Sequence, residues 1–143
     1  MEYTIGQVAQ KTGLTTHTLR YYDKENLLPK IRKNSAGIRR YTDEDLNHLA
    51  ILECLKTTGL QLKDIKHYFD LCRQGEKSLR ERRELFCRQK TRLQQQMLEL
   101  QQNMERINFK IRYYDEAFKG GEKGIYERNK QLARDKKRLF SID

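Results

Sequence analysis

Residues 15–29, TTHTLRYYDKENLLP, combine a helix cap, an apolar pair and a basic, aromatic face in one short stretch. Its first threonine is a favoured N-cap residue and its closing proline cannot continue a helix, so we predict a helix over 15–26. Residues three or four apart share a helix face, so placing Leu19 inward puts Tyr22 beside it on the buried side. The outward face is then formed by His17, Arg20, Tyr21 and Lys24.

The residues before this stretch complete a helix-turn-helix. Thr4 as N-cap and Gln7 three residues later form a capping box, which predicts a helix over 4–11. Only residues 12–14, Thr-Gly-Leu, separate the two helices. A short glycine-containing turn between two short helices is typical of a helix-turn-helix. Thr42 repeats the cap and predicts a helix over 42–57, and a weaker cap at Gln61 predicts another over 61–73.

Residues 29–41, PKIRKNSAGIRRY, break the helical rhythm. The turn-forming residues 34–37, Asn-Ser-Ala-Gly, lie between two arms that we expect to be extended. The segment therefore predicts a small β-hairpin, and a basic hairpin directly after a helix-turn-helix is a wing. It contains no acidic residue and carries five cations, Lys30, Arg32, Lys33, Arg39 and Arg40.

Apolar residues recur every seven positions from residue 79 onward, and two such series alternate spacings of four and three between 93 and 118. This heptad pattern predicts a long helix that buries its stripe against a second helix, because the stripe is not stable alone in water. Arg83 and Lys90 interrupt the early part, which leaves room there for contact with another part of the protein. The predicted dimerisation seam is Leu79, Phe86, Leu93, Met97, Leu100, Met104, Ile107, Ile111, Tyr114 and Phe118.

The composition favours a polyanionic partner. The 143 residues include 30 Lys and Arg against 20 Asp and Glu, a net charge of +10. Hydrophobic residues make up 36%, too few for a large globular core, and 35% charged residues favour long exposed helices. We expect no membrane span and no signal peptide, because no apolar run approaches the roughly 20 residues of a span. Three cysteines in no framework spacing fit a reducing cytoplasm.

The alternatives to a DNA-binding protein are an enzyme, a structural coiled-coil adaptor and a protein that binds a membrane surface. The Arg20 face could be an ordinary solvated helix surface, but the wing and the dimerising helix favour DNA. We expect no enzyme, because the three histidines lack partners at triad spacing and no glycine-rich phosphate loop is present. A structural coiled-coil adaptor would explain residues 78–118 and leave the cationic wing unexplained. Binding to a membrane surface is disfavoured by the regular heptads.

Several motifs together resemble the DNA-binding domain of the MerR family of bacterial transcription regulators. They are TIGQVA (4–9), TLRYYD (18–23), LLP (27–29), GIRRY (37–41) and GL-LKDI (59–65), and the resemblance covers about residues 1–118. It implies a mainly α fold with a winged helix-turn-helix, followed by a long helix that forms an antiparallel coiled-coil dimer. We expect a DNA-binding domain over 1–76, a dimerisation helix over 77–119 and a charged tail, helical or irregular, over 120–143.

The resemblance also implies a site and a mechanism. Such a homodimer binds double-stranded promoter DNA in the cytoplasm, at the nucleoid, and bends and untwists it. This realigns two promoter elements for RNA polymerase, so activation is indirect. The implied DNA contacts are Thr16, His17, Thr18, Arg20, Tyr21, Lys24, Arg32, Lys33, Arg39 and Arg40.

The effector is a separate question. Metal-sensing members of the family carry a cysteine at the start of the dimer helix and further cysteines in a C-terminal loop. Here Ser78 and Leu79 occupy that start and residues 119–143 contain no cysteine, so the resemblance implies no metal site, and we expect no cofactor.

Around Cys54 the chain resembles the NmlR/AdhR-type branch, whose cysteine at this position responds to reactive aldehydes. The resemblance implies activation by electrophile or aldehyde modification of Cys54. The alternatives are that Cys54 is a small buried apolar residue, or that the effector is different or absent. Cys72 and Cys87 are alternative sensing residues, but we expect structural roles for both, as for His67.

Overall fold

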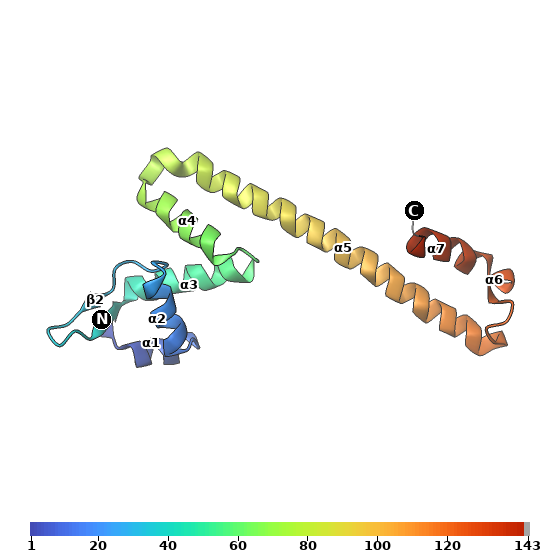
Figure 1. The fold of residues 1–143 in the computed structure, drawn as a ribbon, viewed down its shortest axis with the longest axis horizontal. Helices are drawn as coiled ribbons and strands as arrows, with labels where there is room; N and C mark the ends of the chain where they lie inside the picture. The colour runs from blue at the N-terminus through green and yellow to red at the C-terminus, as the bar shows by residue number, and fades with distance from the viewer. Residues whose placement is uncertain (142–143) are drawn as a thin grey trace. The chain divides into compact units, whose positions relative to one another are not determined.

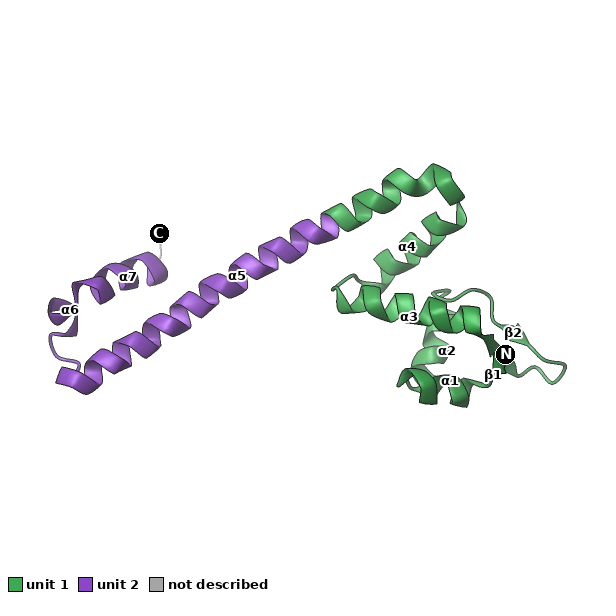
Figure 2. Ribbon diagram, turned by 180° about the vertical axis from the view of Figure 1, so that it is seen from behind, with its two compact units in different colours: residues 1–87 green, residues 88–143 purple. Residues whose placement is uncertain are grey.

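The computed structural model describes residues 1–141, and the chain divides into two compact units, Met1–Cys87 and Arg88–Asp143 (Figure 2). Helices dominate both units, with one small sheet in the first (Figure 1). The mainly α fold with a winged helix-turn-helix and a long helix is as predicted. The first unit contains β1 (Glu2–Tyr3), α1 (Ile5–Thr12), α2 (Thr16–Lys24), β2 (Arg32–Lys33), β3 (Arg39–Thr42), α3 (Asp43–Thr57), α4 (Leu62–Arg73) and the 3₁₀ turn η1 (Gly75–Ser78). Helix α5 (Leu79–Gly120) runs from the first unit into the second, and α6 (Ile125–Arg128) and α7 (Lys130–Phe140) follow it.

The predicted threonine caps start the helices of the first unit. The Thr4 N–H donates to Gln7 Oε1 (2.8 Å) and the Gln7 N–H donates to Thr4 Oγ1 (3.2 Å). Thr42 forms the same reciprocal box with Asp45 at the start of α3. Gly13 ends α1 in the left-handed conformation, with φ 74°, where a residue with a Cβ would be strained. Local sequence alone therefore sets these helix boundaries to within a residue or two.

The wing belongs to a three-stranded sheet in the order β1-β3-β2, and both pairings are antiparallel. Asn34 holds its turn, because the side-chain oxygen accepts hydrogen bonds from the N–H groups of Ala36 and Ile38, both at 3.0 Å. We did not predict β1. Its two residues are too few to show strand alternation, and it exists because Tyr3 pairs with Tyr41 of β3.

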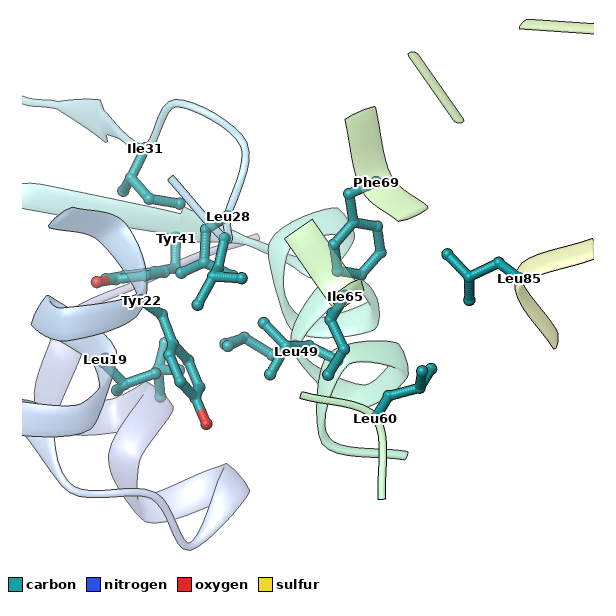
Figure 3. Packing of buried hydrophobic residues seen from close by; sticks show 13 residues of the cluster. Leu19, Tyr22, Leu28, Ile31, Tyr41, Leu49, Leu60, Ile65, Phe69 and Leu85 are labelled. Carbon is teal, nitrogen blue, oxygen red and sulfur yellow. The ribbon is translucent and has the colours of Figure 1, made fainter. Parts of the chain in front are cut away.

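One hydrophobic cluster joins the helices of the first unit (Figure 3). Leu19 and Tyr22 of α2 are buried, as predicted, and pack with α3 and α4. Leu85, in the first turns of α5, is buried in the same cluster. The start of α5 thus packs in the core of the first unit, which agrees with the interruption of its heptad pattern at Arg83 and Lys90.

The segment after α5, expected to be helical or irregular, forms α6 and α7, and both pack on α5. Ile125 and Leu132 are buried against Phe109 of α5, with Leu139 at the edge of this cluster. Arg112 of α5 also pairs with Asp135 of α7, at 2.8 Å. The signal lay in the sequence, because residues 125, 132 and 139 continue a seven-residue apolar spacing among many charges.

Replacing Leu132 with Ala is expected to weaken the docking of α7 on α5 by about 2–5 kcal/mol, because it removes a fully buried side chain and leaves a cavity. Hydrogen exchange of the α7 amides should accelerate accordingly, while amides of the first unit keep their rates. The exposed Lys137→Ala serves as the control. Equal protection of α7 in the two variants would show that Leu132 does not hold the helix.

Candidate nucleic-acid interface

The outward face of α2 is exposed and cationic. His17, Arg20, Tyr21 and Lys24 are exposed, with the Tyr21 side chain at 44%, and we call these four residues the reading face. The buried Leu19 and Tyr22 fix which side of α2 points outward (Figure 3). Within residues 1–141 no carboxylate forms an ion pair with a cation of this face.

Thr16 and Thr18, the other two predicted contacts on α2, are half-buried. The Thr18 hydroxyl lies 2.9 Å from Thr15 Oγ1, and the Thr18 N–H donates to the same oxygen at 3.0 Å. Thr18 is therefore part of the helix cap. Its hydroxyl would have to share that cap hydrogen bond with any ligand.

The wing places like charges opposite one another. In the register of β2 and β3, Arg32 faces Arg40 and Lys33 faces Arg39. Like charges in directly opposed positions destabilise a strand pair. Among the described residues a carboxylate pairs with only one of the four, because Arg39 Nε donates to Asp23 Oδ2 at 2.7 Å. A bound polyanion would relieve the remaining repulsion.

The Arg39–Asp23 pair also connects the wing to α2. Both side chains are largely buried, with 33% and 22% of their surface exposed. The pair therefore orients the wing relative to the reading face. The structure separates Arg39, which positions the wing, from the exposed Arg32 and Lys33.

Helix α4 extends the basic surface, which the sequence did not lead us to predict. Tyr21 of α2 and Lys63 and Lys66 of α4 line one cleft of about 320 Å³, in which Glu25 is the one acidic residue. No side chain caps the N-terminus of α4 at Gln61, so its first N–H groups are available to an anion. The available signal was the weak cap at this position.

Tyr22 anchors α2 to α3 through a polar network. Its hydroxyl donates to Glu53 Oε1 (2.7 Å) and accepts from Lys56 Nζ (3.0 Å). Burial raises the pKa of the Tyr22 hydroxyl, and the hydrogen bond to Tyr22 raises the pKa of Lys56. The Lys56 ammonium is thus directed to Tyr22, although Lys56 is only two residues from Cys54 in the sequence.

Cys54 is exposed on α3, which contradicts the alternative of a small buried residue. Cys87 is also exposed and Cys72 is half-buried. Over residues 1–141, no group of three or more His, Cys, Asp or Glu side chains could hold a metal ion. None of the helices in that same range is long and apolar enough to cross a bilayer.

His48 is half-buried inside the first unit. Its Nε2 lies 3.1 Å from the Leu27 carbonyl oxygen, and its ring stacks on Phe69 with centroids 3.9 Å apart. Burial lowers the pKa of His48 below its ordinary value of 6.5. The unfolded chain then binds a proton more readily than the folded chain.

Stability of the first unit is therefore expected to be full above about pH 6.5 and to fall as the pH drops through the folded pKa of His48. His48→Asn should flatten this part of the profile, whereas the exposed His67→Asn should leave it unchanged. Urea unfolding between pH 8 and pH 5, followed by circular dichroism, measures the difference. A His48→Asn profile as steep as wild type would assign the pH dependence to other groups.

The predicted seam is an exposed apolar stripe on α5. In the second unit its residues are about half or more exposed, from 54% for Ile111 and Tyr114 to 87% for Phe118, except Leu93 at 37%. Phe86, in the first unit, lies edge-on to Tyr68 of α4 with centroids 5.0 Å apart. Phe109 is not one of the seam residues, and its side chain is buried against α6 and α7. The stripe is thus distinct from the face that the chain covers itself.

Comparison with known proteins identifies the family. Residues 3–72 match the family described as MerR HTH family regulatory protein. An uncharacterized HTH-type transcriptional regulator of Haemophilus influenzae is 40% identical over 82% of this chain and 87% of that protein. The chain belongs to the MerR family. Its relatives are transcription regulators, so this MerR protein is a regulator and not an enzyme.

Other MerR relatives agree with the resemblance to the NmlR/AdhR-type branch. The regulator AdhR of Bacillus subtilis is 33% identical over 62% of this chain and 64% of AdhR. The crystal structure of HiNmlR, a MerR regulator lacking the sensor domain and bound to promoter DNA, is 39% identical. The match covers 87% of this chain and 96% of that one, with a TM-score of 0.67. A putative MerR regulator from Listeria monocytogenes reaches a TM-score of 0.71 at 29% identity, over 90% and 98% of the two chains.

Proposed function

We propose that this MerR protein is a homodimeric transcription regulator that binds double-stranded promoter DNA in a sequence-specific manner. The observation that carries the proposal is that α2 and the wing both present exposed cations, Arg20 and Lys24 on α2 and Arg32 and Lys33 on the wing, that pair with no carboxylate of residues 1–141. A coiled-coil adaptor has no use for opposed like charges such as Arg32 and Arg40. The similarity to HiNmlR, whose structure contains promoter DNA, supports the same partner.

The two parts of the surface suit two kinds of contact. Helix α2 has the size and exposure to enter a major groove, where Arg20 can donate to a guanine edge. The wing cations and the α4 lysines suit phosphates, which fix register and carry no sequence information. In this proposal residues 1–76 bind DNA, residues 77–119 dimerise, and residues 120–143 form a separate C-terminal element.

Dimerisation through the seam would give two reading faces for two half-sites. We propose the antiparallel pairing of α5 that the family resemblance implies. The dimer would bend and untwist the promoter, and so act on RNA polymerase through DNA shape. Its place would be the bacterial cytoplasm, at the nucleoid.

Titration of duplex binding with salt tests the proposal. The purified protein and a labelled duplex from the region upstream of its own gene should bind with log K falling linearly in log salt, by about 0.9 for each neutralised phosphate. A duplex of scrambled sequence should bind far more weakly. An adaptor would bind neither duplex, and this result would refute the proposal.

We further propose that Cys54 senses an aldehyde or another electrophile. Its sulfur is accessible on α3, and the AdhR and NmlR relatives share the branch that the sequence resembles. The thiolate would attack the carbonyl carbon, the carbon–oxygen π electrons would move to oxygen, and this oxygen would take a proton from water. The added group would change the packing at α3 and shift a two-state equilibrium of the dimer. A regulator with another effector, or with none, is the alternative.

Cys54→Ala is expected to bind the promoter with wild-type affinity and to lose aldehyde-induced transcription completely. In vitro transcription from its own promoter, with and without an aldehyde, measures both states. Cys87→Ala is the matched control, because Cys87 is also exposed, and it should keep the response. Normal induction of the Cys54→Ala protein would remove this residue from the mechanism.

A further inference from the structure

Helix α7 packs on α5 with its apolar face and presents a cationic face on another side. The DNA contacts proposed above all lie in the first unit and do not include this cationic face. Lys130, Arg134 and Lys137 follow one another at spacings of four and three, which places them on one side of the helix. All three are exposed. Leu132 is buried on the other side, against Phe109. We call the three residues the basic stripe.

Neighbouring charges of α7 have partners inside the second unit. Arg138 pairs with Glu105 at 3.1 Å, and Lys136 lies over the Tyr126 ring at 4.8 Å. The one acid of α7, Asp135, is buried and bound to Arg112. In contrast, no carboxylate among residues 1–141 pairs with the basic stripe. Within that range the stripe's side chains form one hydrogen bond, from Arg134 to the neutral Gln131. The stripe is thus a row of three positive charges without a carboxylate partner among residues 1–141, on a helix that packs on α5 through its other side.

The chemistry of the stripe selects its partner. A protein partner would need an apolar or aromatic centre, and a lipid surface would need an exposed apolar face. On α7, Leu132 is buried and Leu139 half-buried in the cluster with Phe109 and Ile125, so Phe140, at the end of the helix and 39% exposed, is the one large apolar side chain of α7 that remains exposed. A second copy of α7 would bring like charges together. A phosphate backbone needs only cations at intervals, which the stripe provides.

We propose that the basic stripe binds the sugar–phosphate backbone of double-stranded DNA, as a second contact in addition to that of the reading face. This inference rests on the proposed DNA-binding function. Seven residues of helix span about 10 Å, and each DNA strand carries a phosphate about every 3.4 Å along the axis. The stripe therefore reaches two or three phosphates per protomer.

The test compares two variants that lose the same charge. Lys130→Gln/Arg134→Gln/Lys137→Gln neutralises the stripe, and Lys77→Gln/Arg80→Gln/Arg88→Gln removes three exposed cations elsewhere. Glutamine is a good helix former, and hydrogen exchange of the α7 amides verifies that the helix stays docked. Affinity for a 60-base-pair duplex from the region upstream of its own gene is measured across a salt series. Vesicles containing anionic lipid provide a parallel binding assay.

The stripe variant should reduce the slope of log K against log salt by about 2–3 per protomer, and the control variant should keep the wild-type slope. Equal slopes for wild type and the stripe variant, or an equal reduction in the control, would overturn the inference. A loss of vesicle binding with unchanged DNA binding would also overturn it, in favour of a membrane. In all three cases wild type still binds DNA, so the proposed function survives. Its own failure is recognised separately, by wild type not binding.

Discussion

Ile107→Asp is expected to convert the protein into a monomer and to lower its affinity for the promoter by roughly 100- to 10,000-fold. Ile107 lies within the seam and is 59% exposed, so the substitution leaves the fold of its own unit intact. In a dimer the two new carboxylates would be buried in an apolar interface, which is costly without a partner. The monomer would meet one half-site at a time and lose the gain from simultaneous binding.

Sedimentation velocity and duplex binding by the same preparation measure both effects. Leu98→Asp is the matched control, because Leu98 is on the same helix, is 48% exposed and lies outside the heptad series. It should remain a dimer and bind normally. If Ile107→Asp sediments as a dimer, the seam is not the dimer interface, and the proposed two-half-site binding loses its basis.

The parts of the fold that the sequence predicted depend on neighbouring residues. The cap at Thr4 lies three residues from its partner Gln7, and the buried positions of α2 repeat at helical spacing. The heptads of α5 are regular because a single repeated contact selects them. Such patterns need no knowledge of the rest of the chain, so helix boundaries and the exposed stripe could be predicted.

The parts that could not be predicted depend on side chains that meet across the fold. Arg39 pairs with Asp23, 16 residues away, and this partner could not be predicted from the wing sequence. Lys56 donates to the Tyr22 hydroxyl, 34 residues away, which its own stretch of sequence does not indicate. A linear pattern gives the face of a helix and not the partner of a long side chain.

Two further features could not be predicted from the sequence, because both depend on which helices pack together. Lys63 and Lys66 join it only because α4 lies beside Tyr21. The docking of α7 depends on Phe109, which the heptad series of α5 does not include. In both places the sequence supplied charged or apolar residues whose neighbours only the folded chain defines.

Arg20→Ala is expected to lose about 1–3 kcal/mol of binding free energy per half-site, and therefore about twice that in a dimer that carries two copies. Arg20 is exposed at the centre of the reading face, and no carboxylate within residues 1–141 competes for it. If it donates to a base edge, the loss is large on the promoter duplex and small on a scrambled one. If Arg20 contacts a phosphate, the affinity falls equally for both duplexes, and the slope of log K against log salt is reduced by about one per protomer.

Fluorescence anisotropy with the two duplexes, at several salt concentrations, separates these outcomes. Arg80→Ala removes the same side chain from an exposed site at the start of α5 and should bind both duplexes as wild type does. The direction of the Arg20 side chain is set by the burial of Leu19 beside it. Unchanged binding of Arg20→Ala on both duplexes would therefore mean that this side of α2 does not face DNA, and the proposed reading face would have to be abandoned.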